Sequence, residues 1–164
     1  MDHNRHRAVQ PTIGVWTHNG DLLGIQDVGA RIFAELKTVE TGSWLRRSAH
    51  GQGIGKEMRA AVLLWAFDWL GAEVALTSAW DWNEPSLGVS RRLGYVPNGE
   101  RRVITRRGVV ERELGLRLAR EDFARPSWPL AVVGMEAVAA FLGVAKDDGD
   151  REPRARGRAE ERRG

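Results

Sequence analysis

The sequence predicts an α/β domain with a mixed, mostly antiparallel sheet. Two observations carry this prediction. The apolar pattern gives the order strand, strand, strand, helix, strand, helix, strand, strand over residues 12–118. The strand–helix–strand unit in the middle requires one parallel pair, because a helical crossover returns the chain in the same direction, whereas the flanking hairpins are antiparallel. A length of 164 residues leaves room for one such domain.

The first part of the predicted sheet is a meander of three strands. Apolar and polar residues alternate from Thr12 to Thr17, as in a strand with one buried face. The Asn19-Gly20 pair is the strongest short signal for a hairpin turn, so Leu22 to Val28 is predicted as the returning strand. Thr38 to Leu45 is predicted as the third strand, with no helix before it.

A long helix is predicted next, from about Ile54 to Leu70. Its large apolar residues recur on one helical stripe, formed by Met58, Val62, Trp65 and Trp69. Gly71 follows at the position where a C-terminal cap is expected.

The remaining elements complete the sheet. Glu73 to Trp80 is predicted as a strand of the buried type. Asn83 is the predicted N-cap of a second helix, which has Pro85 in its first turn and ends near Leu93. The last hairpin is predicted from two strands, Val103 to Thr105 and Val109 to Leu118.

Composition divides the chain into a domain and its flanks. Residues 1–11 are polar and are predicted as a disordered lead, followed by the folded domain at 12–125. Residues 126–145 are predicted as an apolar C-terminal helix, because the run Leu130 to Ala145 holds a single charge, Glu136. Such a helix packs into a core or against a partner. Residues 146–164 mix basic and acidic side chains and are predicted as a disordered tail.

Composition also excludes several classes of function. The chain has no cysteine, which rules out disulfides, thiolate metal sites and a sulfur-bound acyl-enzyme, and its four histidines are scattered, so no metal site is predicted. No apolar run is long enough to cross a bilayer and no secretory signal is seen, so we expect a cytoplasmic protein without a membrane partner. Arginine pairs such as Arg101-Arg102 lack interleaved aromatic residues, which disfavours nucleic acid.

The most informative segment is the loop His50-Gly51-Gln52-Gly53-Ile54-Gly55-Lys56, between the third strand and the first helix. Its spacing fits neither a dinucleotide fingerprint nor a P-loop. Glycines allow a ligand to approach the backbone, and a helix N-terminus presents unpaired N–H groups and partial positive charge. The loop therefore favours phosphate binding. The alternative is a glycine-rich connection that only makes a tight turn.

The same loop resembles the acyl-CoA motif of the GNAT N-acyltransferases, Q/R-x-x-G-x-G/A, here His50-x-x-Gly53-x-Gly55. Further matches follow in the family's order: GSWL before the loop, GKEMRAAVLLWAF in the helix, Asn83-x-x-Ser86, and SRRLGY at 90–95. Together they resemble the RimJ/RimL branch, some similar members of which carry the name succinyl-CoA transferase. The resemblance covers about residues 20–123 and implies the GNAT fold around a central β-α-β acyl-CoA-binding unit.

The resemblance implies an enzyme that transfers an acyl group from acetyl-CoA or succinyl-CoA directly to an amine, either a protein N-terminus or a small molecule, without a metal. Main-chain N–H groups of Gln52 to Lys56 would hold the pyrophosphate, and the strand around Trp44-Leu45-Arg46 would bind the pantetheine like an added strand. The residues implied to bind the cofactor are Trp44, Leu45, Arg46, His50, Gly51, Gln52, Gly53, Ile54, Gly55, Lys56, Asn83 and Ser86.

Two residues are candidates for catalysis. Ser90 stands seven residues after Asn83, where the family often has the tyrosine that protonates the leaving thiolate. A serine hydroxyl is a poor acid, and the alternative is an ordinary helix serine. Glu40 is the candidate general base, with a solvated strand glutamate as its alternative. Tyr95 is expected to pack in the core. A succinyl donor would need a cation near the thioester, for which Arg31, Arg46 and Arg47 are available.

The sequence departs from the family pattern in two ways. His50 replaces the usual Gln or Arg, a change we expect to be tolerated because the main chain holds the pyrophosphate. Only eleven polar residues precede the first hairpin, where family members carry a strand and two helices, so an N-terminally truncated fold is expected. An uncovered edge and apolar face would favour association, such as a homodimer. The alternative function is a non-catalytic acyl-CoA-binding or dimerisation protein.

Overall fold

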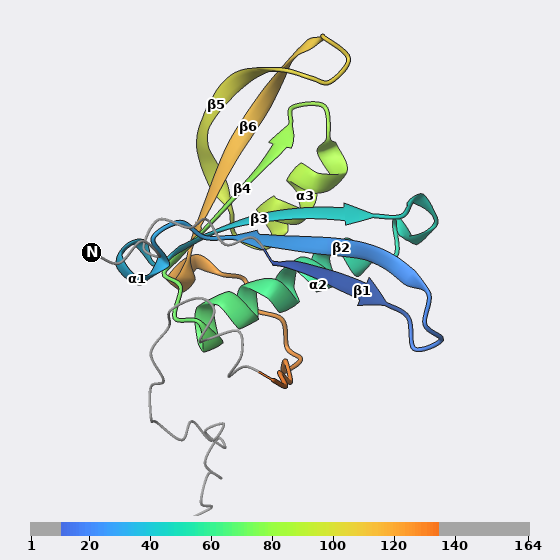
Figure 1. Cartoon of the computed structure of the whole chain (residues 1–164), viewed down its shortest axis with the longest axis vertical. Coiled ribbons are helices and arrows are strands. Elements are labelled where there is room, and N and C mark those ends of the chain that lie inside the picture. Colours follow the sequence, from blue (N-terminus) through green and yellow to red (C-terminus); the bar gives the residue numbers. More distant parts are fainter. Residues whose placement is uncertain (1–10, 135–164) are drawn as a thin grey trace, which may run out of the picture.

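A computed structural model describes residues 11–134 and contains a six-stranded sheet in the order β1-β2-β3-β4-β6-β5 (Figure 1). β3 and β4 are parallel, and all other neighbours pair antiparallel. The prediction of a mixed, mostly antiparallel α/β sheet is confirmed. The strands are β1 (Thr12–Trp16), β2 (Leu22–Gly29), β3 (Thr38–Leu45), β4 (Val74–Trp80), β5 (Val96–Ile104) and β6 (Val110–Ala119).

Three helices connect these strands. α2 (Ile54–Leu64) follows β3, and α3 (Glu84–Arg92) follows β4. The predicted N-cap of α3 is confirmed, because Asn83 Oδ1 accepts a hydrogen bond from the Ser86 N–H at 3.3 Å. The expectation of no helix before the third strand was wrong, since α1 (Phe33–Leu36) forms one turn there. A single turn buries only Phe33 and is too short to produce a periodic pattern.

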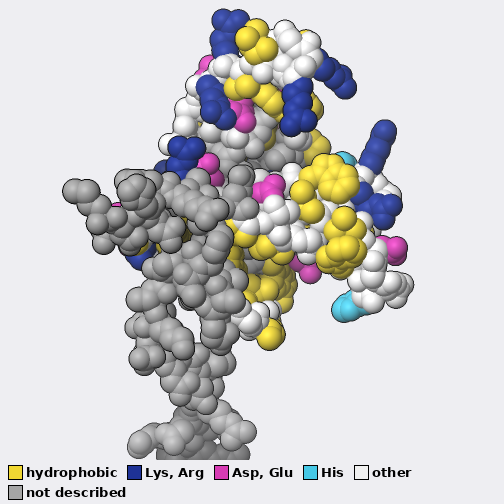
Figure 2. Space-filling model, in the orientation of Figure 1, with side chains coloured by type: hydrophobic (Ala, Val, Ile, Leu, Met, Phe, Trp, Pro, Cys, Tyr) yellow, Lys and Arg dark blue, Asp and Glu magenta, His cyan; other side chains and the backbone are white. Residues whose placement is uncertain are grey.

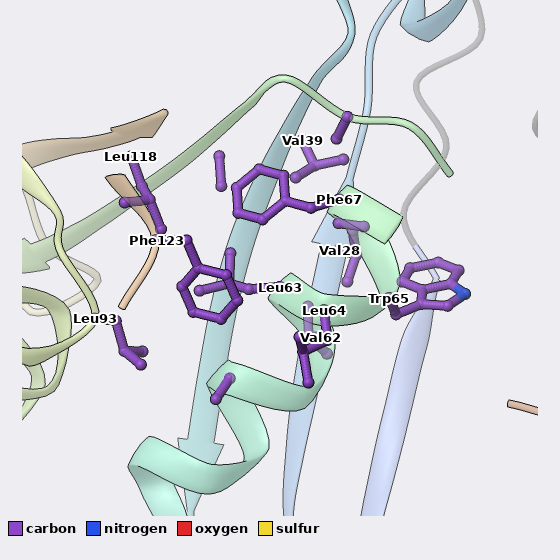
Figure 3. Close-up of a cluster of buried hydrophobic side chains, with 14 of the residues drawn as sticks. Val28, Val39, Val62, Leu63, Leu64, Trp65, Phe67, Leu93, Leu118 and Phe123 are labelled. Carbon is purple, nitrogen blue, oxygen red and sulfur yellow. The ribbon is translucent and has the colours of Figure 1, made fainter. Parts of the chain in front are cut away.

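The core lies between α2 and the inner face of the sheet (Figure 3). Met58, Val62 and Trp65 of the predicted stripe are buried, but Trp69 is 48% exposed. The reason is a π-helical turn at 65–69, in which the Leu70 N–H donates to the carbonyl of Trp65 at 3.2 Å. A π turn adds one residue, so the buried position passes to Leu70 and Trp69 rotates outward.

β3 and β4 separate halfway along their length. Their ladder begins at the pair Thr38 and Val74 and ends at the pair Thr41 and Thr77. Beyond that point β3 stays paired with β2 and β4 stays paired with β6. Figure 1 shows the two strands diverging, with α3 beside the opening. A V-shaped gap therefore opens at the carboxyl ends of the parallel pair, next to the loop that leads into α2.

β5 begins at Val96, earlier than the predicted Val103. The early part contains Pro97 and the Asn98-Gly99 pair, which are turn signals in sequence. It is nevertheless paired, because β5 is an edge strand, where proline is tolerated, and because a register shift between Pro97 and Glu100 absorbs the irregularity.

The predicted C-terminal helix is described only in part. Residues 126–134 form no helix, and residues 135–145 lie outside the described residues, as do most of the predicted lead (1–10) and the whole predicted tail (146–164). Within residues 11–134, no helix is long and apolar enough to cross a membrane.

Candidate functional site

The glycine loop leads directly into an uncapped helix. Gly51 and Gly53 have φ of 75° and 82°, the left-handed region that favours glycine. Gly53 is the N-cap of α2, and no side chain caps this end. The Lys56 and Glu57 N–H groups donate to the Gly53 carbonyl, at 3.0 and 3.1 Å. The N–H groups before them are left available to a ligand, so the site can bind an anion such as a phosphate.

Two side chains of this loop brace it from within. Nε2 of His50 lies 2.9 Å from the carbonyl oxygen of Leu45, and Nε2 of Gln52 donates to the carbonyl of Ser48 at 2.9 Å. Both side chains are thus engaged with the backbone of the loop and of the preceding strand. What the loop presents to a ligand is main chain, which fits the expectation that a histidine at position 50 is tolerated.

The end of β3 forms one wall of the gap. From Gly42 onward, the edge of β3 that faces the gap has no ladder partner, because the pairing with β4 ends at Thr41. Ser43 and Trp44 are exposed there, and Leu45 lies beside the start of α2, since a Cβ added at Gly55 would meet its Cδ2 at 3.8 Å. A free strand edge of this kind can bind an extended chain of amides by β-augmentation.

The structure brings most of the predicted cofactor residues together. Trp44 and Leu45 end β3, Arg46 follows them directly, and the loop His50 to Lys56 comes after one short turn. Asn83 and Ser86 lie apart from these residues in sequence, at the N-terminus of α3 beyond the end of β4, which is the other wall of the gap. The Asn83 carbonyl is used as the helix cap.

A buried polar cluster lies on the helix-covered side of the gap, and sequence reasoning missed its central residue. Arg59 of α2 is 3% exposed, and Ser90 of α3 is fully buried. The guanidinium donates from Nη1 to Ser90 Oγ at 2.7 Å and from Nη2 to Ser43 Oγ at 2.8 Å. Burial lowers the pKa of Arg59, with a smaller opposing effect from Tyr95. The guanidinium thus joins the two walls of the gap.

The candidate acid Ser90 is occupied within this cluster. Its hydroxyl donates to the Ser86 carbonyl at 3.1 Å and accepts from Arg59. The signal that could have found Arg59 was its place beside Met58 in the helix sequence, between residues that must be buried. A charged residue there has to reach a polar partner inside the protein.

Tyr95 completes the polar cluster. Its side chain is buried, as predicted, and its hydroxyl lies 3.4 Å from Thr41 Oγ1. Burial raises the pKa of Tyr95, and the hydrogen bond to Thr41 and the charge of Arg59 partly oppose this rise. Thr77 Oγ1 donates to the Thr41 carbonyl at 2.8 Å, so hydroxyl groups surround the point where β3 and β4 part.

The opposite face of the same strands carries an acidic cleft of about 420 Å³. Glu40 lines this cleft, as do Glu100 and Glu113. Glu113 binds Arg101 and accepts from Ser78 at 2.7 Å, and Glu100 lies 3.5 Å from Arg112. Figure 2 shows basic side chains gathered around the β5–β6 hairpin, with acidic ones between them. Within residues 11–134, Glu40 has no ion-pair partner.

The structure does not bring the predicted cations into this cleft. Arg31, Arg46 and Arg47 are all exposed, and the cleft is lined by none of them. Across residues 11–134, no cluster of His, Asp and Glu side chains is arranged to hold a metal ion.

Comparison with known proteins identifies the family. A model described as an acetyltransferase (GNAT) domain matches residues 4–96, more than half of the chain. The class that the parted strands and the glycine loop define is therefore that of the GNAT acetyltransferases. The chain belongs to this family.

Solved structures agree on the fold. Spermidine N-acetyltransferase from Vibrio cholerae, in complex with CoA and spermine, matches with a TM-score of 0.62 and 14% identity over 69% of this chain and 67% of that one. A dodecameric structure of the same enzyme gives a TM-score of 0.62 and 13% identity, over 68% and 66%. A candidate ribosomal-protein-serine acetyltransferase from Vibrio cholerae gives 0.58 and 20%, over 67% and 64%. The chain spans about two thirds of the length of these structures.

Proposed function

We propose that this protein is an acyl-CoA-dependent N-acyltransferase. The observation that carries the proposal is the parting of β3 and β4 beside the uncapped, glycine-rich start of α2. The helix start supplies N–H donors for a pyrophosphate, and the exposed edge of β3 offers backbone hydrogen bonds to an extended amide chain. One ligand that has both groups in sequence is coenzyme A.

The residues divide the binding task along the gap. Main-chain N–H groups from Gln52 to Gly55 hold the pyrophosphate, because the Lys56 N–H already donates to the Gly53 carbonyl. The ammonium of Lys56 adds a positive charge to the first helical turn. The pantetheine arm pairs with the edge of β3 at Trp44, Leu45 and Arg46. Asn83 and Ser86 contact the pantetheine arm from the opposite wall of the gap, at the start of α3. The thioester then lies where the strands part, between the acidic cleft and the buried arginine.

The chemistry is a direct transfer. The amine nitrogen attacks the thioester carbon, an N–C bond forms, the C–S bond breaks, and its electron pair leaves with sulfur as a thiolate. Glu40 accepts the proton that the amine gives up, directly or through water, because its carboxylate lines the cleft without an ion-pair partner in residues 11–134. Ser90 lies on the leaving-group side, together with Arg59.

The finer assignment follows the resemblance to the RimJ/RimL branch. The donor is acetyl-CoA or succinyl-CoA, and the acceptor is an amine, such as a protein N-terminus or a small molecule, in the cytoplasm. The fold shared with a candidate ribosomal-protein-serine acetyltransferase and with a spermidine N-acetyltransferase supports an amine acceptor in general terms. The dodecameric relative supports self-association, of which a homodimer is the smallest form.

A second candidate function is acyl-CoA binding without catalysis. The observation that favours it is the complete burial of Ser90, whose hydroxyl is already donated to the Ser86 carbonyl. A protein of this kind would bind acyl-CoA through the loop and β3 but would not transfer the acyl group.

Binding and turnover distinguish the two candidates. We would titrate the purified chain with acetyl-CoA, succinyl-CoA and free CoA by calorimetry and follow thermal unfolding. A ligand at 100 times its Kd that binds only the folded state stabilises it by about 2.7 kcal/mol. Binding with release of free thiol in the presence of a peptide or polyamine acceptor supports the enzyme. Binding without thiol release supports the second candidate, and a folded chain that binds no CoA overturns both.

A further inference from the structure

Arg59 has more hydrogen-bond donors than the protein satisfies. A guanidinium carries five N–H groups. In the described part of the chain Arg59 makes two hydrogen bonds, both to serine hydroxyls. Its Nε is buried without a partner. No carboxylate of residues 11–134 lies within ion-pair distance of it.

An isolated buried cation is costly for a protein to keep. Buried charges are normally paired, because removing an ion from water costs several kcal/mol that neutral hydroxyls only partly offset. The burial of Arg59 is nearly complete, at 3% exposure. A guanidinium in this environment is suited to stabilise a negative charge that is present only when a ligand is bound or reacting.

The position of Arg59 indicates where that charge arises. Its two hydrogen bonds reach Ser43 on β3 and Ser90 on α3, the elements that form opposite walls of the gap. Ser43 is the first residue on the helix-covered side of β3 beyond the last β3–β4 pair, and it is exposed. The guanidinium therefore lies under the gap, close to the point where the thioester is placed by the proposed function.

We propose that Arg59 stabilises the negative charge on the leaving CoA thiolate, with Ser90 and Ser43 holding its guanidinium in position. This inference rests on the proposed function. When the C–S bond breaks, both electrons go to sulfur, and Arg59 stays protonated throughout, so no proton has to move at this step. The thiolate then takes a proton from water after release. This role removes the need for a serine hydroxyl to act as an acid.

The other groups around Arg59 do not supply the same charge. Ser43 of β3 and Ser90 of α3 accept hydrogen bonds from it, and Tyr95, just before β5, lies near it and contacts Thr41. All four are neutral at physiological pH. The acidic groups of the cleft lie on the opposite face of the sheet. Among the described cations, Lys56 is nearest in sequence on α2, but it is exposed, so water screens its charge.

The test uses the absence of cysteine in the chain, which leaves the thiol of bound CoA as the only thiol in the complex. The ultraviolet absorbance of its thiolate is followed against pH, with the complex of S-methyl-CoA as the blank. The blank cancels the ionisation of Tyr95. We expect the pKa of the bound thiol to lie at least one unit below that of free CoA, a tenfold change in ionisation, or about 1.4 kcal/mol.

Variants assign the effect to one side chain. Arg59→Met should return the thiol pKa to that of free CoA or above and lower kcat about 100-fold, while the Kd for CoA changes less than threefold. Arg59→Lys keeps the charge and should retain part of the shift. Arg92→Met, the matched control, removes an exposed charge from the end of α3, two residues after Ser90, and should leave the thiol pKa within about 0.3 unit.

The outcomes separate this inference from the proposed function. A wild-type chain that does not bind CoA overturns both. CoA binding with an unshifted thiol pKa in the wild-type complex overturns only the role of Arg59, and this measurement needs no variant. An equal effect of Arg92→Met and Arg59→Met also overturns it. If Arg59→Met does not fold, the wild-type complex and Arg59→Lys decide.

Discussion

The two faces of the sheet differ sharply at the point where β3 and β4 part. On the helix-covered face, Arg59, Ser90 and Tyr95 are buried, and the cluster carries one positive charge. On the open face, Glu40 is exposed and shares a cleft with Glu100 and Glu113. Glu40 and Ser43 are only three positions apart on β3, so both environments meet at one gap.

A single strand, β3, presents both environments. Successive side chains of a strand point to opposite faces, so β3 places Glu40 and Gly42 on the open side and Thr41 and Ser43 on the covered side. Water reaches the open side and can carry protons away from a base. On the covered side Arg59 is buried, so its charge acts with little screening. The proposed base and the proposed anion-stabilising group thus lie on opposite faces of the sheet.

Removing the carboxylate of the open face should have the largest effect. Glu40→Gln is expected to lower kcat about 100-fold, because a general base contributes 10²- to 10⁴-fold. The affinity for acyl-CoA and the thermal stability should change little, since Glu40 is exposed and unpaired within residues 11–134. Steady-state kinetics with a saturating amine measures the change.

The matched control lies in the same cleft. Glu100→Gln removes a carboxylate that is already engaged with Arg112 and should keep kcat within about twofold of the wild type. Equal losses in the two variants would show that the cleft acts only through its overall charge, and Glu40 would lose its role as the base.

The glycine loop that leads into α2 lies next to the gap. Gly53→Val should weaken CoA binding at least tenfold, because a side chain at the helix N-cap blocks the approach of a phosphate. Gly20→Val is the matched control. Both glycines have φ above 80°, and a Cβ at either meets no atom within 4 Å, so the backbone strain is equivalent. Calorimetry with CoA should show the loss for Gly53 alone.

Much of the fold was predictable from local patterns in the sequence. The residues Thr38 to Leu45 were predicted as a strand with the bounds that the structure shows, and Asn83 was predicted as the cap of α3. Alternation and helix capping depend on residues close in sequence, so they can be recognised without knowing which elements lie nearby in the fold. β5 was predicted too short because its early part carries turn residues. That part is held by pairing with β6, in which Pro97 lies opposite Leu116, and a local pattern does not reveal such a pairing.

The site was predictable only where it depends on the main chain. The loop His50 to Lys56 was found because glycine spacing reports directly on backbone geometry. Arg59 was missed because its hydrogen-bond partners are Ser43 and Ser90, which lie 16 and 31 residues away in sequence. Nothing in the helix pattern shows that a charge between Met58 and Val62 will meet two hydroxyls. The register shift at Trp69 was missed for the same reason, since a π turn has no simple signature.

The smallest expected effect is at Tyr95, and it depends on whether water reaches the phenol on the covered face. Tyr95 is buried, and its pKa is raised above the ordinary value of 10.0, so the folded state holds the phenolic proton more tightly than the unfolded state does. Its contribution to stability is therefore complete below pH 10 and is lost as the pH rises from 10 through the folded-state pKa. We expect the Tm of the wild type to fall in this window more steeply than that of Tyr95→Phe.

At pH 7 the Tyr95→Phe variant should lose at most about 1 kcal/mol of stability, because the hydrogen bond between Tyr95 and Thr41 is long, at 3.4 Å. Thr41 also keeps a second hydrogen bond, to the carbonyl of Leu76. Thermal unfolding of both proteins from pH 8 to 11 measures the difference. Parallel curves would mean that water reaches the phenol, and the contrast between a dry and a wet face of the gap would not hold at Tyr95.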